Sequence, residues 1–379
     1  MKRVKRNNAM IKPLKYVSKI KPYVPGKPVK ELERELGIRD SIKLASNENP
    51  LGPSPKALEA LKELLSADGG LNRYPDDTGY YLKNALTERL SRGGNGSRAK
   101  ISPDEIILGN GSNSLIDVAV RTFMGPGDEA IMGTPSFVFY PIAVGSVGGV
   151  SIEVPLVDYR HDLTAMADAV TEKTKIVFIA NPNNPTGTIN KRGEFERFME
   201  KIPEGILVVM DEAYYEYVHD SEYPDTLKYL FEGRDILILR TFSKVYGLAG
   251  LRIGYGIAPK AIITEMDKIR GPFNTNSAAQ AAALQALSDE AHLKKTVEIN
   301  EQGKEFLYKE LGAMGISYVP TEANFIYMPL KAESRDIYNA LLKTGVIIRP
   351  VGPNAIRVTV GLPEENRRFI EALKKIKEL

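Results

Sequence analysis

The strongest constraint on the fold is an alternation along the chain. From about residue 100, short runs rich in β-branched residues alternate with longer segments of helical periodicity. This pattern is typical of a parallel sheet in an α/β domain. Several runs are apolar without interruption, as expected for strands covered on both faces. We predict a mostly parallel seven-stranded sheet between helices, with strands at residues 105–108, 129–132, 151–154, 176–179, 206–210, 236–239 and 254–257.

The last hundred residues have a different pattern and predict a smaller α+β domain. In the large domain we expect helices at 54–66, 79–90, 112–123 and 192–201, and an alanine-rich helix at 277–287 begins the later part of the chain. A long helical region then leads to strands at 316–319, 324–327, 346–349 and 355–360 and a last helix at 364–377. We therefore expect a basic, disordered tail at 1–15, a segment at 16–45 that joins the small domain, a large domain at 46–275 and a small domain at 276–379.

Composition excludes several classes of function. The 51 Lys and Arg residues nearly balance the 48 Asp and Glu residues, so we expect no nucleic-acid partner. No apolar run approaches the roughly 20 residues that span a bilayer, so we expect no membrane partner. The chain has no cysteine, which excludes disulfides and thiol catalysis and fits a cytoplasmic location. Its three histidines lie far apart without ligand spacing, so we expect no metal site.

Lys244 and Arg252 suit a cofactor that carries both an aldehyde and a phosphate. The lysine ends the segment Thr241-Phe242-Ser243-Lys244 after a predicted strand, and Arg252 follows eight residues later. A lysine amine can form a Schiff base with an aldehyde, while Ser243 and Arg252 can hold a phosphate. Because most lysines are solvated surface groups, this hypothesis depends on three further segments.

A second predicted strand, at 105–108, runs into small residues that precede a helix. They are Gly109-Asn110-Gly111-Ser112-Asn113. The free N–H groups at such a helix start suit a phosphate. An ordinary tight turn with Ser112 as the helix N-cap explains this segment equally well.

Two more predicted strands end in polar residues at the edge where α/β sheets bind ligands. The strand at 176–179 leads into a loop that contains Asn184-Pro185-Thr186-Gly187. The strand at 206–210 ends in Asp211-Glu212-Ala213-Tyr214. A carboxylate after five apolar residues needs a partner, and a protonated pyridine nitrogen is one. The alternative for Asp211 is an acidic helix N-cap.

Together these segments resemble the fold-type I pyridoxal-phosphate (PLP) aminotransferases, and more closely the histidinol-phosphate aminotransferases. The matches run nearly end to end. Besides the segments above, they include Pro22-Tyr23-Val24-Pro25-Gly26-Lys27, Ser46-Asn47-Glu48-Asn49-Pro50, Arg73-Tyr74-Pro75, Gly271-Pro272-Phe273-Asn274 and Ile356-Arg357-Val358-Thr359-Val360-Gly361. The lysine, the arginine and the Asn-Pro-Thr-Gly loop are specific for the superfamily. The segments around Tyr23 and Asn47 point to the subfamily.

The resemblance implies a role for each cofactor-binding residue. Lys244 is the Schiff-base lysine and moves a proton from the substrate's Cα, and Asp211 pairs with the pyridine nitrogen. Tyr214 and Asn184 hydrogen-bond the ring oxygen. The residues expected around the phosphate are Gly111, Ser112, Asn113, Thr241, Ser243 and Arg252. Phe137 falls where the family usually has a tyrosine stacked on the ring. Phenylalanine can stack but donates no hydrogen bond, and an ordinary core aromatic is the alternative.

The resemblance also implies a substrate site. Arg357 binds the anionic end of each substrate, because a bidentate arginine suits both a carboxylate and a phosphate. Tyr23 and Arg349 are further donors to a substrate phosphate, and Asn47 belongs to the same site. Arg349 could equally be a surface residue at a strand end. The implied reaction converts L-histidinol phosphate and 2-oxoglutarate into imidazole-acetol phosphate and L-glutamate, in histidine biosynthesis.

Three alternatives remain at this point. An aminotransferase for phenylalanine or tyrosine would keep the cofactor and change the amino donor. A lyase similar to threonine-phosphate decarboxylase would break the bond to the carboxylate instead of the Cα–H bond. A regulator with an aminotransferase-like sensing domain would need a DNA-binding domain, for which the sequence before Tyr16 has no room.

Finally, the resemblance implies a homodimer in which Tyr74 reaches the partner's cofactor phosphate. A tyrosine in the turn Arg73-Tyr74-Pro75-Asp76 is poorly placed for burial unless a partner receives its hydroxyl. The alternative is a tyrosine packed within its own subunit.

Overall fold

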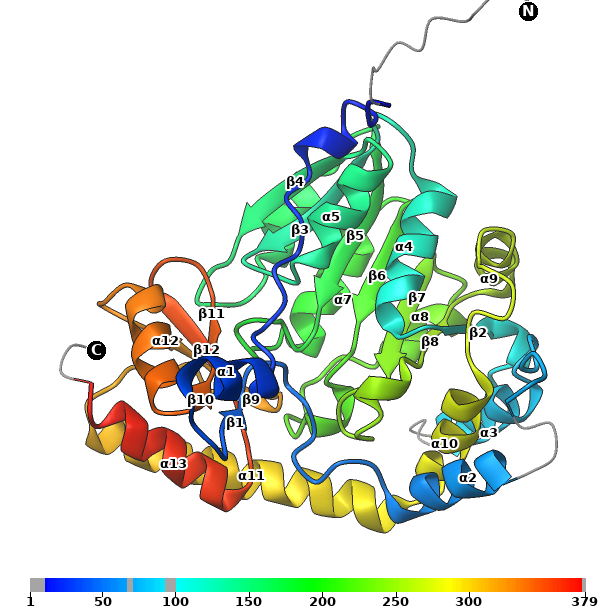
Figure 1. Cartoon of the computed structure of the whole chain (residues 1–379). Helices are drawn as coiled ribbons and strands as arrows, with labels where there is room; N and C mark the ends of the chain where they lie inside the picture. The colour runs from blue at the N-terminus through cyan, green and yellow to red at the C-terminus, as the bar shows by residue number, and fades with distance from the viewer. Residues whose placement is uncertain (1–10, 67–70, 93–99, 377–379) are drawn as a thin grey trace, which may run out of the picture.

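The computed structural model describes residues 11–66, 71–92 and 100–376, and these form a large and a small domain (Figure 1). The long helix α11 (Glu290–Ala313) runs along the base of the molecule in Figure 1, from α2 (Pro55–Ser66) to α13 (Pro363–Leu373). The basic tail expected at 1–15 lies mostly outside the described residues.

The large domain is built on a seven-stranded sheet in the order β2-β8-β7-β6-β5-β3-β4. The strands are β2 (Ile106–Gly109), β3 (Glu129–Thr134), β4 (Val150–Pro155), β5 (Thr174–Ala180), β6 (Leu207–Asp211), β7 (Ile236–Thr241) and β8 (Gly254–Ile257). All neighbouring strands are parallel except that β8 runs antiparallel to β2 and β7. The predicted fold class is confirmed, and each strand lies within a few residues of its predicted place.

The apolar runs form central strands because the sheet is covered on both faces. In β6, Leu207 and Val209 belong to one hydrophobic core, and Val208 and Met210 belong to another. Period-two alternation sends successive side chains to opposite faces, so both sets must be apolar. The first core is shared with α4 (Ser112–Phe123), α5 (Phe139–Ser146) and α9 (Lys260–Asp267). The second is shared with helices that include α3 (Tyr80–Arg92), α6 (Leu163–Asp168), α7 (Arg192–Lys201) and α8 (Leu227–Phe231).

The alanine-rich helix α10 (Ser277–Leu287) packs against α2 and α3. Its buried alanines, including Ala279, Ala282 and Ala283, belong to the core of the large sheet. Small side chains let these helices approach closely. The domain boundary between residues 275 and 276 remains a prediction, and α10, just after it, packs with the large domain.

The small domain holds a three-stranded antiparallel sheet in the order β11-β12-β9. Its strands are β9 (Phe325–Pro329), β11 (Arg349–Pro350) and β12 (Ala355–Thr359), and its helices α11, α12 (Ser334–Lys343) and α13 pack on it. The N-terminal segment adds α1 (Val29–Leu36) and β1 (Ile42–Lys43). Because β1 pairs in parallel with β10 (Val346–Ile347), this segment lies beside the small domain.

The small domain departs from prediction in two places. The strand predicted at 316–319 is wrong, since only Val319 forms a bridge, to Tyr327. It lies between Gly315, at φ 68°, and Pro320, which has no N–H to extend a ladder. The strand predicted at 346–349 divides into β10 and β11, which belong to different sheets. The last helix ends at Leu373, and residue 377 lies outside the described residues.

Within the described part of the chain, no helix combines the length and the apolar character needed to cross a membrane.

Candidate active site

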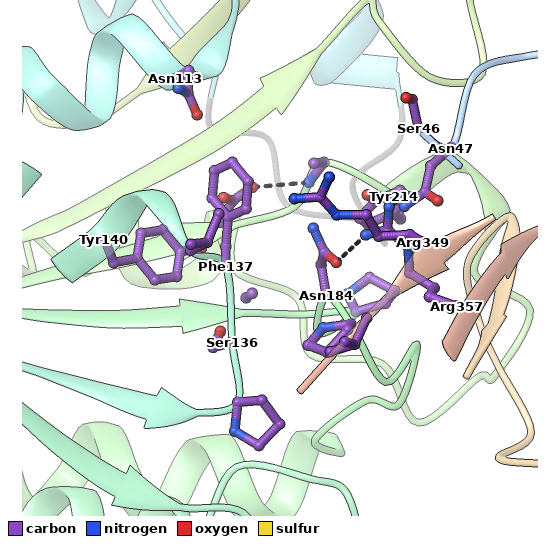
Figure 2. A pocket seen from close by; sticks show the side chains of 18 of the residues that line it. Ser46, Asn47, Asn113, Ser136, Phe137, Tyr140, Asn184, Tyr214, Arg349 and Arg357 are labelled. Atoms are coloured by element: carbon purple, nitrogen blue, oxygen red, sulfur yellow. Dashed lines mark hydrogen bonds between the residues drawn. The ribbon is translucent and has the colours of Figure 1, made fainter. Parts of the chain in front are cut away.

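One cavity of about 570 Å³ gathers almost all the residues that the sequence selects. It lies where β5, β6 and β7 end, and small-domain residues from β11 and β12 close its other side (Figures 1 and 2). The selected residues that line it are Tyr23, Asn47, Ser112, Asn113, Phe137, Asn184, Asp211, Tyr214, Thr241, Ser243, Lys244, Arg252, Arg349 and Arg357. Of the selected residues, Gly111 and Tyr74 do not line this cavity.

Lys244 reaches the cavity from the loop after β7. Its Nζ donates a hydrogen bond to the Ser46 carbonyl at 3.1 Å and lies 5.6 Å from the centre of the Tyr214 ring. Burial, and then the positive charge of Arg357, lower the pKa of the amine to about 7. A substantial fraction of Lys244 is therefore neutral near pH 7, as a nucleophile toward an aldehyde must be.

Asp211 is the last residue of β6, and only 6% of its surface is exposed. Tyr140 donates its hydroxyl to Oδ2 at 2.8 Å, and the Ala213 N–H donates to Oδ1 at 3.2 Å. Both of these donors are uncharged groups. Burial therefore dominates and raises the pKa of Asp211 to about 6. A buried carboxylate with neutral donors suits a cationic partner such as a protonated pyridine nitrogen.

Arg252 and the loop before α4 form an anion-binding corner. Gly111 has φ 75°, and a Cβ there would lie 2.3 Å from Nη2 of Arg252, so only glycine allows the guanidinium to approach. Arg252 donates from Nη1 to the Ser243 hydroxyl at 3.3 Å and the Ala249 carbonyl at 3.1 Å. Ser112 begins α4 beside this corner. A guanidinium, hydroxyls and a helix N-terminus are a donor set that fits a phosphate.

Tyr214, Asn47 and Asn184 line the side that faces the small domain (Figure 2). Asn47 Nδ2 donates to the Tyr214 hydroxyl at 2.8 Å. Asn184 Oδ1 accepts a bond from Nη1 of Arg357 at 2.5 Å. Burial raises the pKa of the Tyr214 hydroxyl, which favours its protonated form. The roles of Tyr214 and Asn184 toward a ring oxygen remain predictions.

Arg357 is a buried cation at the junction of the domains. It lies on β12, donates from Nη2 to the Ala45 carbonyl at 2.8 Å, and is 9% exposed. Its Nε has no hydrogen-bond partner among the described residues. Burial lowers its pKa, yet an arginine remains protonated at any physiological pH. An incompletely satisfied buried guanidinium is suited to an anionic ligand.

Arg349 and Tyr23 lie at the edge of the cavity. The Arg349 guanidinium is 5.3 Å from the centre of the Tyr23 ring and donates to the Val24 carbonyl at 2.9 Å. Arg349 thus contacts the N-terminal segment, and both side chains line the cavity. The distances permit a shared anion site, and the phosphate role remains a prediction.

Sequence reasoning missed Tyr140 and Ser46. Tyr140 lies on α5, makes an edge contact with Phe137 at 5.5 Å and stacks on Phe178 at 4.6 Å. Phe137 lies before the start of α5 (Phe139–Ser146), so no helical spacing links it to Tyr140, and the sequence gives no local signal for the contact with Asp211. Ser46 contributes a backbone carbonyl, for which side-chain patterns give no signal.

Tyr74 lies outside the cavity and is 80% exposed. Its ring stacks on Phe273 at 4.5 Å. Since one chain is described, contact with a partner subunit remains a prediction.

The known proteins that resemble this chain agree with this arrangement. The family described as aminotransferase class I and II matches residues 39–373. The chain therefore belongs to the class I and II aminotransferases. A histidinol-phosphate aminotransferase from Moorella thermoacetica is 47% identical over 362 residues, which cover 94% of this chain and 91% of the relative. Histidinol-phosphate aminotransferase 2 from Carboxydothermus hydrogenoformans is 45% identical, with 96% and 99% covered.

Solved structures give the same result. Histidinol-phosphate aminotransferase from Sinorhizobium meliloti, in complex with pyridoxal-5'-phosphate, superposes with a TM-score of 0.86 at 28% identity, covering 97% of both chains. A double mutant of Thermus thermophilus aspartate aminotransferase gives 0.82 at 25% identity, covering 96% of this chain and all of the other. Within its class, the chain belongs to the histidinol-phosphate aminotransferase family, and its cofactor is pyridoxal 5'-phosphate.

Proposed function

We propose that the protein transfers the amino group of L-histidinol phosphate to 2-oxoglutarate, giving imidazole-acetol phosphate and L-glutamate in histidine biosynthesis. The observation that carries this proposal is Arg357, a buried guanidinium whose Nε lacks a partner among the described residues, in the same cavity as Lys244 and Arg349. The names of the relatives support the same substrate.

The cofactor end of the cavity supplies the proton chemistry. Bound pyridoxal phosphate supplies an aldehyde carbon for amines and a ring that withdraws electrons when the Cα–H bond breaks. Lys244, with a pKa of about 7, can take the Cα proton at Nζ and return it near neutral pH. Asp211 holds a proton on the ring nitrogen, and Tyr140 donates to Asp211 and fixes its orientation. Ser243 and Arg252 hold the cofactor phosphate.

The other end of the cavity selects substrates by their anions. Arg357 binds a carboxylate in one half-reaction and the phosphate ester in the other, because its fork fits both. Arg349 and Tyr23 add donors that the phosphate, with more acceptor oxygens, can use. Asn47 orients the Tyr214 hydroxyl through its 2.8 Å bond. Two arginines thus give the phosphate substrate an advantage over an uncharged aromatic side chain.

The two enzymatic alternatives are not favoured, because the similar proteins carry histidinol phosphate in their names. Stopped-flow absorbance, together with CO₂ measurement, distinguishes the proposed reaction from the aromatic aminotransferase and from the lyase. The PLP form is mixed separately with histidinol phosphate, glutamate and phenylalanine, and CO₂ release is measured in parallel. We expect fast conversion with the first two and slow conversion with phenylalanine. Faster conversion with phenylalanine, or CO₂ release without a keto acid, would overturn the proposal.

We also propose that the active unit is a homodimer in which Tyr74 acts in trans. Its ring is exposed, stacks on the half-exposed Phe273, and leaves its hydroxyl available to a second copy. In an isologous dimer each subunit would complete the other's site. The cytoplasmic location expected from the cysteine-free sequence likewise remains a prediction.

Hybrid dimers test the trans arrangement. Lys244→Ala and Tyr74→Phe subunits are unfolded together and refolded as a mixture. If Tyr74 acts in trans, each hybrid dimer has one intact site and one site with both defects. Since about half the dimers are hybrids, about a quarter of the wild-type activity should return. In cis, every site keeps one defect and no recovery occurs. Refolded Lys244→Ala and Tyr74→Phe, each alone, are the controls.

A further inference from the structure

A buried ion pair lies beside the active site without lining its cavity. Glu212, immediately after β6, has no exposed surface, and Arg240, in β7, is 6% exposed. Nε and Nη2 of Arg240 both lie 2.8 Å from Oε2 of Glu212. The Arg240 guanidinium also lies over the Tyr215 ring at 3.6 Å from its centre. The pair therefore joins the ends of two neighbouring strands.

The same strand ends carry the two groups that handle protons. Asp211 directly precedes Glu212, and Lys244 lies four residues after Arg240. In the sheet, Asp211 pairs with Leu239, and the Glu212 N–H donates to the Leu239 carbonyl at 2.8 Å. Any shift of the ion pair would move Asp211 and the start of the lysine loop relative to each other.

The network around Glu212 extends to the loop that carries Asn184. Thr226 donates its hydroxyl to Oε1 at 2.7 Å, and the Tyr223 hydroxyl lies 3.3 Å from the same oxygen. Tyr223 also hydrogen-bonds the Asn181 carbonyl, where β5 enters that loop. Glu212 thus contacts groups attached to β5 and β7 while belonging to the end of β6.

Stability alone does not account for this pair. Removing two charges from water is costly, and apolar residues of similar volume are often as stable in such a place. We propose that Glu212 and Arg240 are positioning residues, which fix the ends of β6 and β7 and cancel each other's charge beside Asp211 and Lys244. This inference rests on the proposed function of the same site.

Removing one charge of the Glu212–Arg240 pair should shift the proton affinity of the neighbouring groups in a direction that depends on which charge is removed. Asp211 faces Tyr140 from α5, Tyr214 and Lys244, and the charge of Glu212 also acts on it. Lys244 in turn faces Arg357, Glu48 and Arg252. Glu212 faces Arg240, Tyr223 and Glu216, and Arg240 also faces Tyr215 and Tyr255. An unopposed Arg240 would make the site more positive and lower the proton affinity of its groups. An unopposed Glu212 would raise that affinity, or would itself take up a proton and leave it unchanged.

Three variants of the PLP-loaded protein test the inference: Glu212→Gln, Arg240→Met and the double variant. The readouts are the pH midpoint of the absorption change of lysine-bound cofactor and the dissociation constant of PLP. Glu310→Gln is the control, since it breaks the partly exposed Glu310–Lys374 pair of the small domain (2.7 Å), outside the cavity lining. Thermal melting of the cofactor-free proteins reports folding separately.

We expect Glu212→Gln to lower the midpoint by about 0.5–1.5 pH units, the size expected for one uncompensated charge nearby. Arg240→Met should raise it or leave it unchanged, and the double variant should return to within about 0.3 units of wild type. PLP binding should weaken roughly tenfold in each single variant, because the strand ends move. Glu310→Gln should change neither readout.

Parallel shifts of the same sign in both single variants, or no shift in Glu212→Gln, would overturn the inference. Should a single variant fail to fold, the double variant and the other single variant decide the sign. The proposed substrate is tested separately, since the titration needs only cofactor bound to Lys244. Failure to use histidinol phosphate would leave these shifts measurable.

Discussion

The two ends of the cavity are built differently. The cofactor floor (Asp211, Tyr214, Ser243 and Lys244) comes from the ends of adjacent strands in one sheet and the loops that follow them. The substrate rim (Tyr23, Arg349 and Arg357) comes from the N-terminal segment and from the small domain. Three floor residues are buried, whereas Tyr23 is 56% exposed, and the Arg349–Val24 bond joins two peripheral segments.

This difference separates chemistry from selection. Pairing between the adjacent strands β6 and β7 fixes the floor. Burial there shifts the pKa values of Lys244 and Asp211 toward the range in which they can act as acid and base. The rim depends on how two distant parts of the chain come together, the N-terminal segment with Tyr23 and the β11–β12 pair, in which Arg349 lies opposite Arg357. Changes to the floor should therefore affect every substrate. In the rim, a change at Arg357, which meets every substrate anion, should do the same, whereas a change at Arg349 should discriminate among substrates.

Lys244→Ala should have the largest effect. Without the amine, both half-reactions should fall by at least about 10⁴-fold, since nucleophile and acid–base group are lost together. Borohydride reduction followed by peptide mapping should label Lys244 in the wild type and no other lysine. Lys260→Ala, at an exposed lysine paired with Asp104, is the matched control. Recovery of unlabelled Lys244 from fully loaded protein would refute the assignment of the floor.

Asp211→Asn should weaken the binding of PLP and increase the folding stability of the cofactor-free protein. PLP affinity should fall about 100-fold with the loss of a charge-assisted contact. The folded pKa of about 6 is raised above the ordinary 3.8, so the protonated carboxyl favours folding, and this contribution is lost as pH rises from about 4 through 6. The asparagine cannot ionise, so above pH 6 it should be more stable by up to about 3 kcal/mol.

Denaturant unfolding of the cofactor-free proteins at pH 5 and pH 8 checks this prediction. The gain should be larger at pH 8, where wild-type Asp211 is ionised. A variant less stable than wild type at pH 8 would mean that the Asp211 carboxylate is not strained by burial.

The same contrast explains how much the sequence could predict. Asp211 directly follows one apolar run, and Lys244 lies five residues after the end of another, at Leu239, so a local pattern locates both at one sheet edge. Tyr140 lies in a helix that the sequence analysis did not single out, and its contact with Asp211 spans 71 positions. The bond from Arg349 to Val24 spans 325 positions, and no local period encodes it. The short strands β10 and β11 were predicted as one, because a two-residue strand carries too little periodicity to show its partner.

Arg357→Ala should damage both half-reactions, because each substrate presents an anion to it. The loss of one charge-assisted contact should cost about 1.5–3 kcal/mol, or roughly tenfold to a hundredfold in kcat/KM for glutamate and for histidinol phosphate alike. Arg357→Lys keeps the positive charge but not the two parallel N–H donors of the guanidinium, so it should recover only part of the lost kcat/KM. A loss confined to one substrate would mean that Arg357 discriminates between the substrates instead of binding the anion of each.

Arg349→Ala should have the smallest effect and the most selective one. A phosphate has acceptor oxygens left after binding Arg357, whereas a carboxylate held bidentately has few, so the extra donor matters mainly to histidinol phosphate. We expect about a tenfold loss of kcat/KM for histidinol phosphate and less than about twofold for glutamate. Arg335→Ala, at an exposed arginine of α12, controls for the loss of surface charge. Since Arg349 also holds the N-terminal segment through Val24, equal losses for both substrates would mean that it acts by closing the cavity rather than by binding phosphate.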